Sequence, residues 1–139
     1  VLNIDSKREV ELRVFEIDLD SIFNNLLVNS IEAFNIMKDD RQRQIQIDVY
    51  SNEKEVIFNY YDTGVGLSKD IDNADKIFEP LFTTKRNPYT AEEEGTGLGM
   101  WLVKSIVKDN DGKVKLLFPE KGFGLRISLP IKYKRQKDE

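Results

Sequence analysis

The chain has 139 residues, of which 40% are hydrophobic and 33% charged, and it contains no cysteine and no histidine. This composition predicts one soluble globular domain and excludes disulfides, thiolate or histidine metal ligands and a phosphohistidine acceptor within the chain. The net charge of −4 argues against a nucleic-acid-binding surface, and no stretch predicts a signal peptide or a membrane span. We expect a cytoplasmic domain with no membrane contact of its own, which leaves open an anchor elsewhere in a parent protein.

The first predicted elements are a strand, a helix and a β-hairpin. The chain opens in a strand-like run, and the rough alternation of residues 10–15 predicts a strand. Asp18 or Asp20 is suited to cap a helix, whose shared face is formed by Ile22, Leu26, Asn29, Ala33 and Met37. Residues 45–50 alternate as a half-buried strand, and residues 56–61 follow a turn at 52–54 as its antiparallel partner.

The second half of the chain predicts two helices and a closing hairpin. Residues 70–77 predict a short helix, and residues 83–94 lack periodicity, as functional or mobile loops do. A helix over 97–109 stops at Asn110-Asp111-Gly112, and residues 114–118 and 125–129 form the last hairpin. These elements predict an α+β fold, a two-layer α/β sandwich with a mixed, mostly antiparallel sheet. Val1 predicts that residues 1–139 are a single domain excised from a longer chain, with a solvated tail at 131–139.

Two asparagines on the first helix are the first candidate site residues. Asn25 and Asn29 lie one helical turn apart, so both carboxamides project to the same side. A carboxamide oxygen is a neutral hard ligand that suits Mg²⁺ carrying water and phosphate ligands. The alternative is that the two residues cap the helix or face solvent, but buried amides need partners. The pattern therefore favours a metal and phosphate site.

Asp62 ends a strand-like run and is followed by Gly64 and Gly66. Its carboxylate is suited to accept a hydrogen bond from the 6-amino group of adenine, and guanine has a carbonyl at that position. The glycines allow the backbone to approach the base. An ordinary Asp-Thr-Gly turn is the alternative, and the neighbouring motifs argue against it.

A third motif, Gly95-Thr96-Gly97-Leu98-Gly99, stands at the start of the last predicted helix. It is not a dinucleotide fingerprint, because Met100 replaces the third glycine, and it lacks the Gly-Lys-Ser or Gly-Lys-Thr ending of a P-loop. Backbone amides at a helix N-terminus attract phosphate oxygens. The motif therefore predicts a phosphate-binding helix start, to which the Thr96 hydroxyl can contribute.

Together with Phe-Glu-Pro-Leu-Phe-Thr-Thr-Lys at residues 78–85, these motifs resemble the N box, first glycine box, F box and second glycine box of sensor histidine kinases. That superfamily also contains gyrase, heat-shock chaperone and mismatch-repair ATPases. The resemblance covers residues 21–130 and implies a histidine-kinase-like ATPase fold that binds ATP with Mg²⁺. The implied nucleotide-binding residues are Asn25, Asn29, Ala33, Asp62, Gly64, Gly66, Phe82, Thr83, Thr84, Lys85, Gly95, Thr96, Gly97, Leu98 and Gly99.

The resemblance also implies roles. Asn29 would ligate Mg²⁺ with support from Asn25, and Lys85 would reach the β- or γ-phosphate as the third catalytic residue, unless it is simply a solvated lysine. Residues 83–94 would form a lid over ATP, anchored at one end by the apolar cluster of Phe78, Pro80, Leu81 and Phe82. The implied reaction transfers the γ-phosphoryl group to a histidine on a separate helical hairpin of the parent protein, and a response regulator is the partner that follows.

Three places distinguish the sequence from particular branches or common patterns of the superfamily that it resembles. Asn25 stands where gyrase-like ATPases and anti-sigma-type serine kinases have a glutamate base, which disfavours hydrolysis of ATP. Glu32 replaces a basic residue of many histidine kinases, and either binds a metal-bound water or lies on the helix surface. Gly124-Leu125 replaces a frequent Thr-Phe pair near the adenine. A gyrase- or chaperone-like ATPase and a non-catalytic nucleotide-gated interaction module remain the alternatives.

Overall fold

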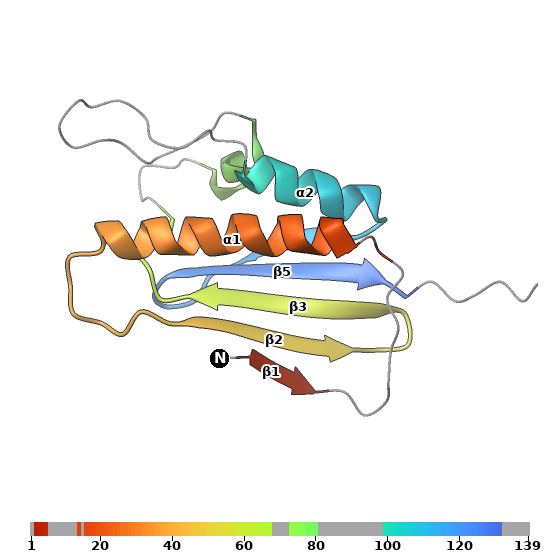
Figure 1. Cartoon of the computed structure of the whole chain (residues 1–139), viewed down its shortest axis with the longest axis horizontal. Coiled ribbons are helices and arrows are strands. Elements are labelled where there is room, and N and C mark those ends of the chain that lie inside the picture. The colour runs from red at the N-terminus through yellow and green to blue at the C-terminus, as the bar shows by residue number, and fades with distance from the viewer. Residues whose placement is uncertain (1, 6–13, 15, 68–72, 81–98, 132–139) are drawn as a thin grey trace, which may run out of the picture.

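The computed structural model describes residues 2–5, 14, 16–67, 73–80 and 99–131. In chain order they form β1 (Leu2–Asp5), α1 (Glu16–Ile36), β2 (Ile45–Ser51), β3 (Glu55–Asp62), the 3₁₀-helix η1 (Ala74–Phe78), α2 (Gly99–Asp109), β4 (Lys113–Leu117) and β5 (Phe123–Pro130). The strands make one five-stranded sheet in the order β1-β2-β3-β5-β4. β1 runs parallel to β2, and every other pair is antiparallel (Figure 1).

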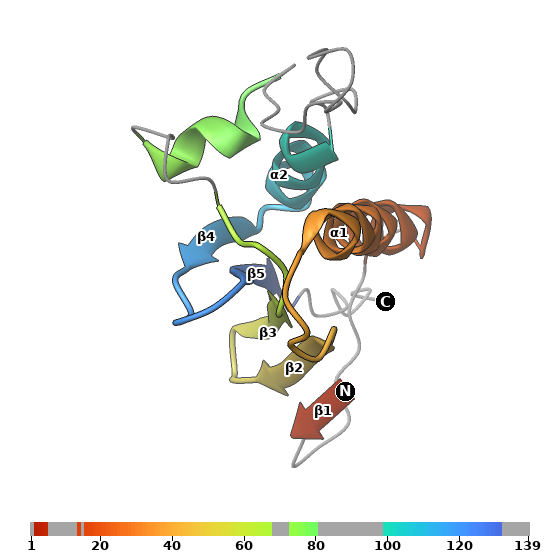
Figure 2. The ribbon, with the colours of Figure 1, turned by 90° about the vertical axis from the view of Figure 1, so that its left-hand side faces the viewer.

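All the helices of the described residues lie on one face of the sheet (Figure 2). The predicted two-layer α+β sandwich with a mixed, mostly antiparallel sheet is therefore confirmed. Its core lies between the layers, where apolar stripes of helix and sheet remove each other from water. The buried residues of this core are Ile22, Leu26, Tyr60, Ile77, Phe78, Val103, Val107, Leu116, Leu125, Ile127 and Leu129.

The register of the central strands decides which side chains face the helices. Tyr60 on β3 pairs with Ile47 on β2 and Leu125 on β5, and Asp62 lies two residues further along the same face. Leu125, one of the departures from the family pattern, is fully buried in this core. The predicted strands at 45–50 and 56–61 and the last hairpin are all present, each within one or two residues of its predicted limits.

α1 begins at Glu16 and includes both Asp18 and Asp20, so the prediction that one of them is the N-cap is wrong. Glu16 and Asp18 lie in the first turn, where carboxylates interact favourably with the helix dipole. Asp18 Oδ2 instead accepts a hydrogen bond of 3.2 Å from Asn110 Nδ2 beyond the end of α2. Asp18, which the local sequence pattern suggests as a helix cap, therefore binds Asn110, a residue distant in sequence.

The buried stripe of α1 runs through Ile22, Leu26 and Ser30. The predicted face placed Asn29 and Ala33 in this stripe, but both are half-buried at its side. A helix turns about 100° per residue, so Ser30 follows Leu26 on the innermost line while Asn29 is turned toward α2. The prediction was therefore right about Ile22 and Leu26, while Ser30 takes the inner position predicted for Asn29 and Ala33 lies at the side of the stripe.

α2 ends where predicted, by a Schellman motif. Gly112 N donates to Val107 O at 2.9 Å, and Asp111 N donates to Lys108 O at 3.0 Å. Asp111 has a φ of +60°, the left-handed conformation that this motif needs. The short helix predicted at 70–77 is a 3₁₀-helix that begins at Ala74, after Asn73 accepts from Asp75 N at 3.0 Å. The strand predicted at 10–15 lies outside the described residues except for Val14, which is not in a strand.

Among the described strands, β4 pairs only with β5, so it is an edge strand of this sheet. Lys113 and Lys115 are exposed on it, while Leu116 is buried against the core. In the described part of the chain, no helix is both long enough and apolar enough to cross a bilayer.

Candidate functional site

The first residue of α2 lies against two asparagines of α1. A Cβ atom built on Gly99 would lie 3.3 Å from Asn25 Oδ1, 3.7 Å from Asn29 Nδ2 and 3.8 Å from Asn29 Oδ1. Asn25 Nδ2 donates to Ser21 O at 2.7 Å, which leaves Oδ1 directed toward α2. The structure therefore brings the first and last sequence motifs together through Asn25, Asn29 and Gly99.

This cluster suits phosphate and a hard cation. The first N–H groups of a helix have no partner within it, and they carry the positive end of its dipole. The first turn of α2 contains no acidic residue that would cancel this potential. Carboxamide oxygens beside such a helix start can share a Mg²⁺ ion with phosphate oxygens. Within the described ranges, no group of three or more acidic, cysteine or histidine side chains offers another metal site.

Asp62 lies at the end of β3 and is 4% exposed. Its Oδ2 accepts from Ser30 Oγ at 2.7 Å, and its Oδ1 accepts from Gly64 N at 2.9 Å. Ser30 Oγ is in turn 2.6 Å from Tyr60 Oη. Both carboxylate oxygens are thus engaged by donors of the protein, one from α1 and one from residues 63–66 after β3, here called the glycine loop.

Tyr60 is fully buried beneath this carboxylate. Burial raises the pKa of Tyr60 to about 12, since the phenolate would be poorly solvated there, and the charge of Asp62 acts in the same direction, although the hydrogen bond with Ser30 opposes it. Tyr60 Oη also donates to Leu26 O at 3.2 Å. The phenol is therefore a neutral donor at physiological pH.

Gly64 packs directly on α1. A Cβ atom at this position would lie 2.8 Å from Ala33 Cβ and 3.1 Å from Asp62 Oδ1, so a larger residue would displace the helix or the carboxylate. Ala33 is thus placed at the glycine loop. It lies eight residues after Asn25, about 12 Å along the helix axis, so one side of α1 connects the Asn25/Asn29/Gly99 cluster to Asp62.

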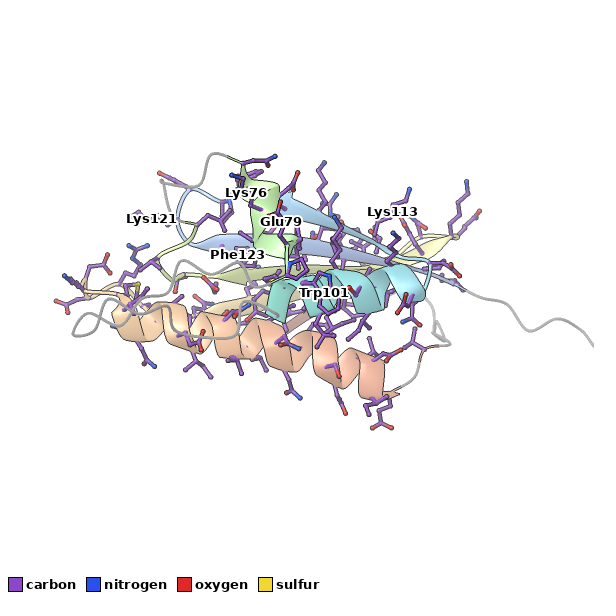
Figure 3. The ribbon with its side chains drawn as sticks, turned by 90° about the horizontal axis from the view of Figure 1, so that it is seen from above. Lys76, Glu79, Trp101, Lys113, Lys121 and Phe123 are labelled. Carbon is purple, nitrogen blue, oxygen red and sulfur yellow. The ribbon has the colours of Figure 1, made fainter. Side chains whose placement is uncertain are left out.

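The tip of the β4–β5 hairpin supports the glycine loop from the other side. A Cβ atom at Gly66, whose φ is +73°, would lie 2.6 Å from Gly122 O. Gly122 has a φ of +87° and itself packs on the backbone of Asp62 and Thr63. Figure 3 shows Lys121, next to Gly122, toward the end of the molecule where α1 ends, and Lys113 toward the end where α1 begins.

The loop between α1 and β2 holds the outer side of the glycine loop. Thr63 Oγ1 donates to Gln42 O at 2.5 Å and accepts from Gln44 N at 2.8 Å. Arg41 Nη1 donates to Gly64 O at 3.4 Å. Arg41 also forms an ion pair with Asp39, with 2.6 Å between Nη2 and Oδ2.

This ion pair changes the titration of both partners. The hydrogen bonds from Arg41 lower the pKa of Asp39, and Asp39 in turn raises the pKa of Arg41. The positive charge of Lys121 adds slightly to the effect on Asp39, which relates the hairpin to the α1–β2 loop. Arg41 therefore stays charged beside the glycine loop at any physiological pH.

Four residues near the site were not predicted from the sequence: Ser30, Tyr60, Arg41 and Gly122. Ser30 offered a signal, because a serine one turn after Leu26 on an apolar helix face needs a partner. Tyr60 offered none, since tyrosine is an ordinary strand residue. Arg41 and Gly122 act across the fold, and only the three-dimensional structure relates them to Asp62.

The remaining predicted site residues lie outside the described residues. These are Phe82, Thr83, Thr84, Lys85, Gly95, Thr96, Gly97 and Leu98, together with the predicted lid at 83–94. The part of the F box that is described places Phe78 in the core, 6% exposed, with Lys104 Nζ 5.2 Å from the centre of its ring.

The two-layer fold defines a domain of the α/β-sandwich ATPase class. A family model described as "Histidine kinase-, DNA gyrase B-, and HSP90-like ATPase" matches residues 15–133. The chain belongs to this family, and the resemblance drawn from the motifs is confirmed.

Several sensor kinases are similar to the chain over most of its length. The sensor histidine kinase FlgS of Helicobacter pylori is 32% identical over 115 residues, which cover 81% of this chain and 27% of FlgS. The sensor histidine kinase GlnK of Bacillus subtilis is 32% identical over 118 residues, 84% of this chain and 27% of GlnK. The chain thus spans about a quarter of the length of these relatives. The solved catalytic domain of histidine kinase ThkA has the same fold, with a TM-score of 0.72, 24% identity and coverage of 94% of this chain and 78% of that one.

Proposed function

We propose that this chain is the catalytic domain of a sensor histidine kinase, which binds ATP with Mg²⁺ and presents the γ-phosphoryl group to a histidine elsewhere in its parent protein. The observation that carries this proposal is the position of Gly99 against both Asn25 and Asn29. A phosphate-attracting helix start beside two neutral oxygen ligands suits an anion and a cation that are bound together.

Each described motif has a part in the proposed reaction. Asn29 would hold Mg²⁺ with help from Asn25, and the metal when bound would offset the charge of the phosphates. The α2 amides would orient phosphate oxygens, and Asp62 would accept from the 6-amino group of adenine. The parts given to Lys85 and residues 95–98 rest on the motifs alone.

The transfer breaks the bond between the γ-phosphorus and the oxygen that remains on ADP, and forms a bond from phosphorus to an imidazole nitrogen. The chain has no histidine, so the acceptor and the base that takes the imidazole proton are on the separate helical hairpin. Asn25 is a carboxamide and cannot take a proton from water at neutral pH. This argues for phosphoryl transfer rather than hydrolysis, and a response regulator would receive the group next.

Calorimetric titration tests the nucleotide site. We expect ATP and ADP to bind in the presence of Mg²⁺, and ATP more weakly after chelation with EDTA. Asp62→Ala should weaken ATP binding by about 1–3 kcal/mol, because a charged acceptor is lost. Asp48→Ala removes a carboxylate from the outer face of the sheet and serves as the matched control. Superimposable ATP titrations of wild type and Asp62→Ala would contradict the assignment.

A labelling experiment with γ-³²P-ATP tests the reaction. Alone, the chain should neither label itself nor release phosphate, and with the parent protein's hairpin added it should label the hairpin histidine. Asn25→Glu places a carboxylate base on α1 beside the start of α2. We expect at most slow hydrolysis of ATP, since about 1 Å of misplacement of the base can abolish the reaction. Brisk Mg²⁺-dependent phosphate release by the wild type would support the ATPase alternative. ATP binding without any transfer would support the interaction module.

A further inference from the structure

Three buried polar groups form a series of hydrogen bonds that ends at Asp62, the proposed adenine contact. Tyr60 Oη lies 2.6 Å from Ser30 Oγ, which lies 2.7 Å from Asp62 Oδ2. Tyr60 and Ser30 have no exposed surface, and Asp62 is 4% exposed. The other buried residues of the described core between helices and sheet are hydrophobic. Alanine and phenylalanine would fill the same space as Ser30 and Tyr60 without any polar group to satisfy.

The hydrogen bonds of this series all have the same donor-to-acceptor direction, from Tyr60 through Ser30 to Asp62. Ser30 has a single hydroxyl proton and donates it to Asp62, because an ionised carboxylate can only accept. Ser30 Oγ can then only accept from Tyr60, whose proton has Leu26 O at 3.2 Å as its second acceptor. The pKa of Tyr60, raised to about 12, keeps this proton on the phenol at neutral pH.

The carboxylate of Asp62 is held on both of its oxygens. Ser30 occupies Oδ2, and Gly64 N donates to Oδ1 at 2.9 Å. A carboxylate has about four lone-pair positions, so each oxygen keeps about one acceptor position in a fixed direction. A carboxylate held in this way cannot rotate to avoid a ligand that offers the wrong group.

We propose that Ser30 and Tyr60 are positioning residues that set the purine specificity of the site by fixing the acceptor direction of Asp62. The inference rests on the proposed binding of ATP, and it assigns the choice between purines to two buried residues that act through Asp62. A purine with an amino group on carbon 6 donates to the fixed lone pair. A purine with a carbonyl there places two acceptors face to face, and one with only hydrogen there loses the bond.

The experiment compares dissociation constants for ATP, GTP and purine-riboside triphosphate, which lacks the 6-amino group, with Mg²⁺ and the whole chain. We expect wild type to bind ATP about tenfold or more tightly than purine-riboside triphosphate, as for a hydrogen bond to a charged group. The measured quantity is the ratio of the dissociation constant of purine-riboside triphosphate to that of ATP. Ser30→Ala should lower this ratio by about three- to tenfold, because Asp62 loses its fixed orientation. Tyr60→Phe should narrow it less, and the double variant should match Ser30→Ala, because Tyr60 acts through Ser30.

Two further sets of variants separate positioning from packing. Ser30→Cys keeps the volume but donates weakly, so its ratio should lie between those of wild type and Ser30→Ala. Tyr61→Phe and Ser128→Ala make the same chemical changes on the outer face of the sheet and should leave the ratio unchanged. Thermal unfolding without nucleotide reports any loss of folding separately from the ratio.

The outcomes are distinct. An equal loss of affinity for all three nucleotides, or an unchanged ratio, in Ser30→Ala and Tyr60→Phe would overturn this inference and leave a packing role. A wild-type chain that binds none of the three nucleotides would overturn the proposed function, and the inference with it. A wild type that binds all three equally would overturn the assigned adenine contact of Asp62 and the inference, while leaving the phosphate and metal site.

Discussion

The α-carbon of Gly122 packs directly on the backbone carbonyl of Asp62, and no side chain fits between them. The two residues come from different parts of the sheet, the β4–β5 turn and the end of β3. Gly122 also has a φ of +87°, a conformation that glycine adopts without strain. The hairpin tip is therefore a fixed support for the strand end that carries the proposed adenine contact.

Replacing Gly122 tests this support. Gly122→Ala should lower the free energy of unfolding by roughly 2–4 kcal/mol, because it combines a left-handed backbone with a contact against another backbone segment. Urea denaturation followed by circular dichroism gives the value. Lys121→Ala, at the exposed neighbouring position, is the control and should change little. Equal urea midpoints for Gly122→Ala and wild type would show that the turn can move away from Asp62.

Gly99→Ala tests the meeting of α2 with the asparagines. The added Cβ would lie 3.3 Å from Asn25 Oδ1, so the carboxamide must shift by a few tenths of an ångström. Stability should change by less than about 0.5 kcal/mol, since alanine is favourable in a helix, but Mg²⁺-ATP binding should weaken by about 1–2 kcal/mol. Titration with and without Mg²⁺ measures the effect, and Ser105→Ala on the same helix is the control. Unchanged Mg²⁺-ATP affinity would argue against Asn25 as a site residue.

Two arginines of the α1–β2 loop should behave in opposite ways. Arg41 donates to Gly64 O, whereas Arg43 donates to Phe34 O and Met37 O at the end of α1, each at 3.4 Å. Arg41→Gln should weaken ATP binding by about two- to fivefold with little loss of stability, since its ion pair is exposed. Arg43→Gln should cost about 0.5–1 kcal/mol of stability with ATP binding unchanged. The same profile for both variants would show that neither arginine acts on the glycine loop specifically.

The raised pKa of Tyr60 predicts that the protein loses stability at alkaline pH. Its pKa is about 12 in the folded protein against 10.0 for an ordinary tyrosine, so the folded state holds the proton more tightly. Its contribution to stability is complete below about pH 10 and is lost as the pH rises from about 10 through about 12. In urea denaturation across this window, Tyr60→Phe should lose less stability than wild type, and Tyr61→Phe should follow wild type. Parallel pH profiles for all three proteins would contradict the role of Tyr60.

Local patterns were enough to predict most of the fold. Short segments of sequence contain the signals for β2 and β3, for the end of α2 and for the last hairpin. The structure contains each of these predicted features. The predicted cap of α1 was wrong because Asp18 is bonded to Asn110, which lies far away in sequence. Periodicity describes one helix at a time and cannot include such partners.

The candidate site was predictable only where a motif carried it. The sequence alone shows the motif spacing of Asn25, Asn29, Asp62 and the glycines. The hydrogen bonds of Ser30 to Tyr60 and Asp62 connect residues that are 30 and 32 positions apart. Each looks like an ordinary core or strand residue when read along the chain. Their relation to Asp62 follows from the register of β3 beneath α1, which only the folded chain defines.

The lysines of β4 have a consequence for the behaviour of the domain in concentrated solution. An open strand edge offers unpaired N–H and C=O groups to any other extended chain, which is how sheets join into aggregates. Exposed Lys113 and Lys115 on β4 would meet the same two charges if a second copy approached edge to edge. This repulsion weakens as salt screens it, so self-association through this edge is expected to increase with ionic strength.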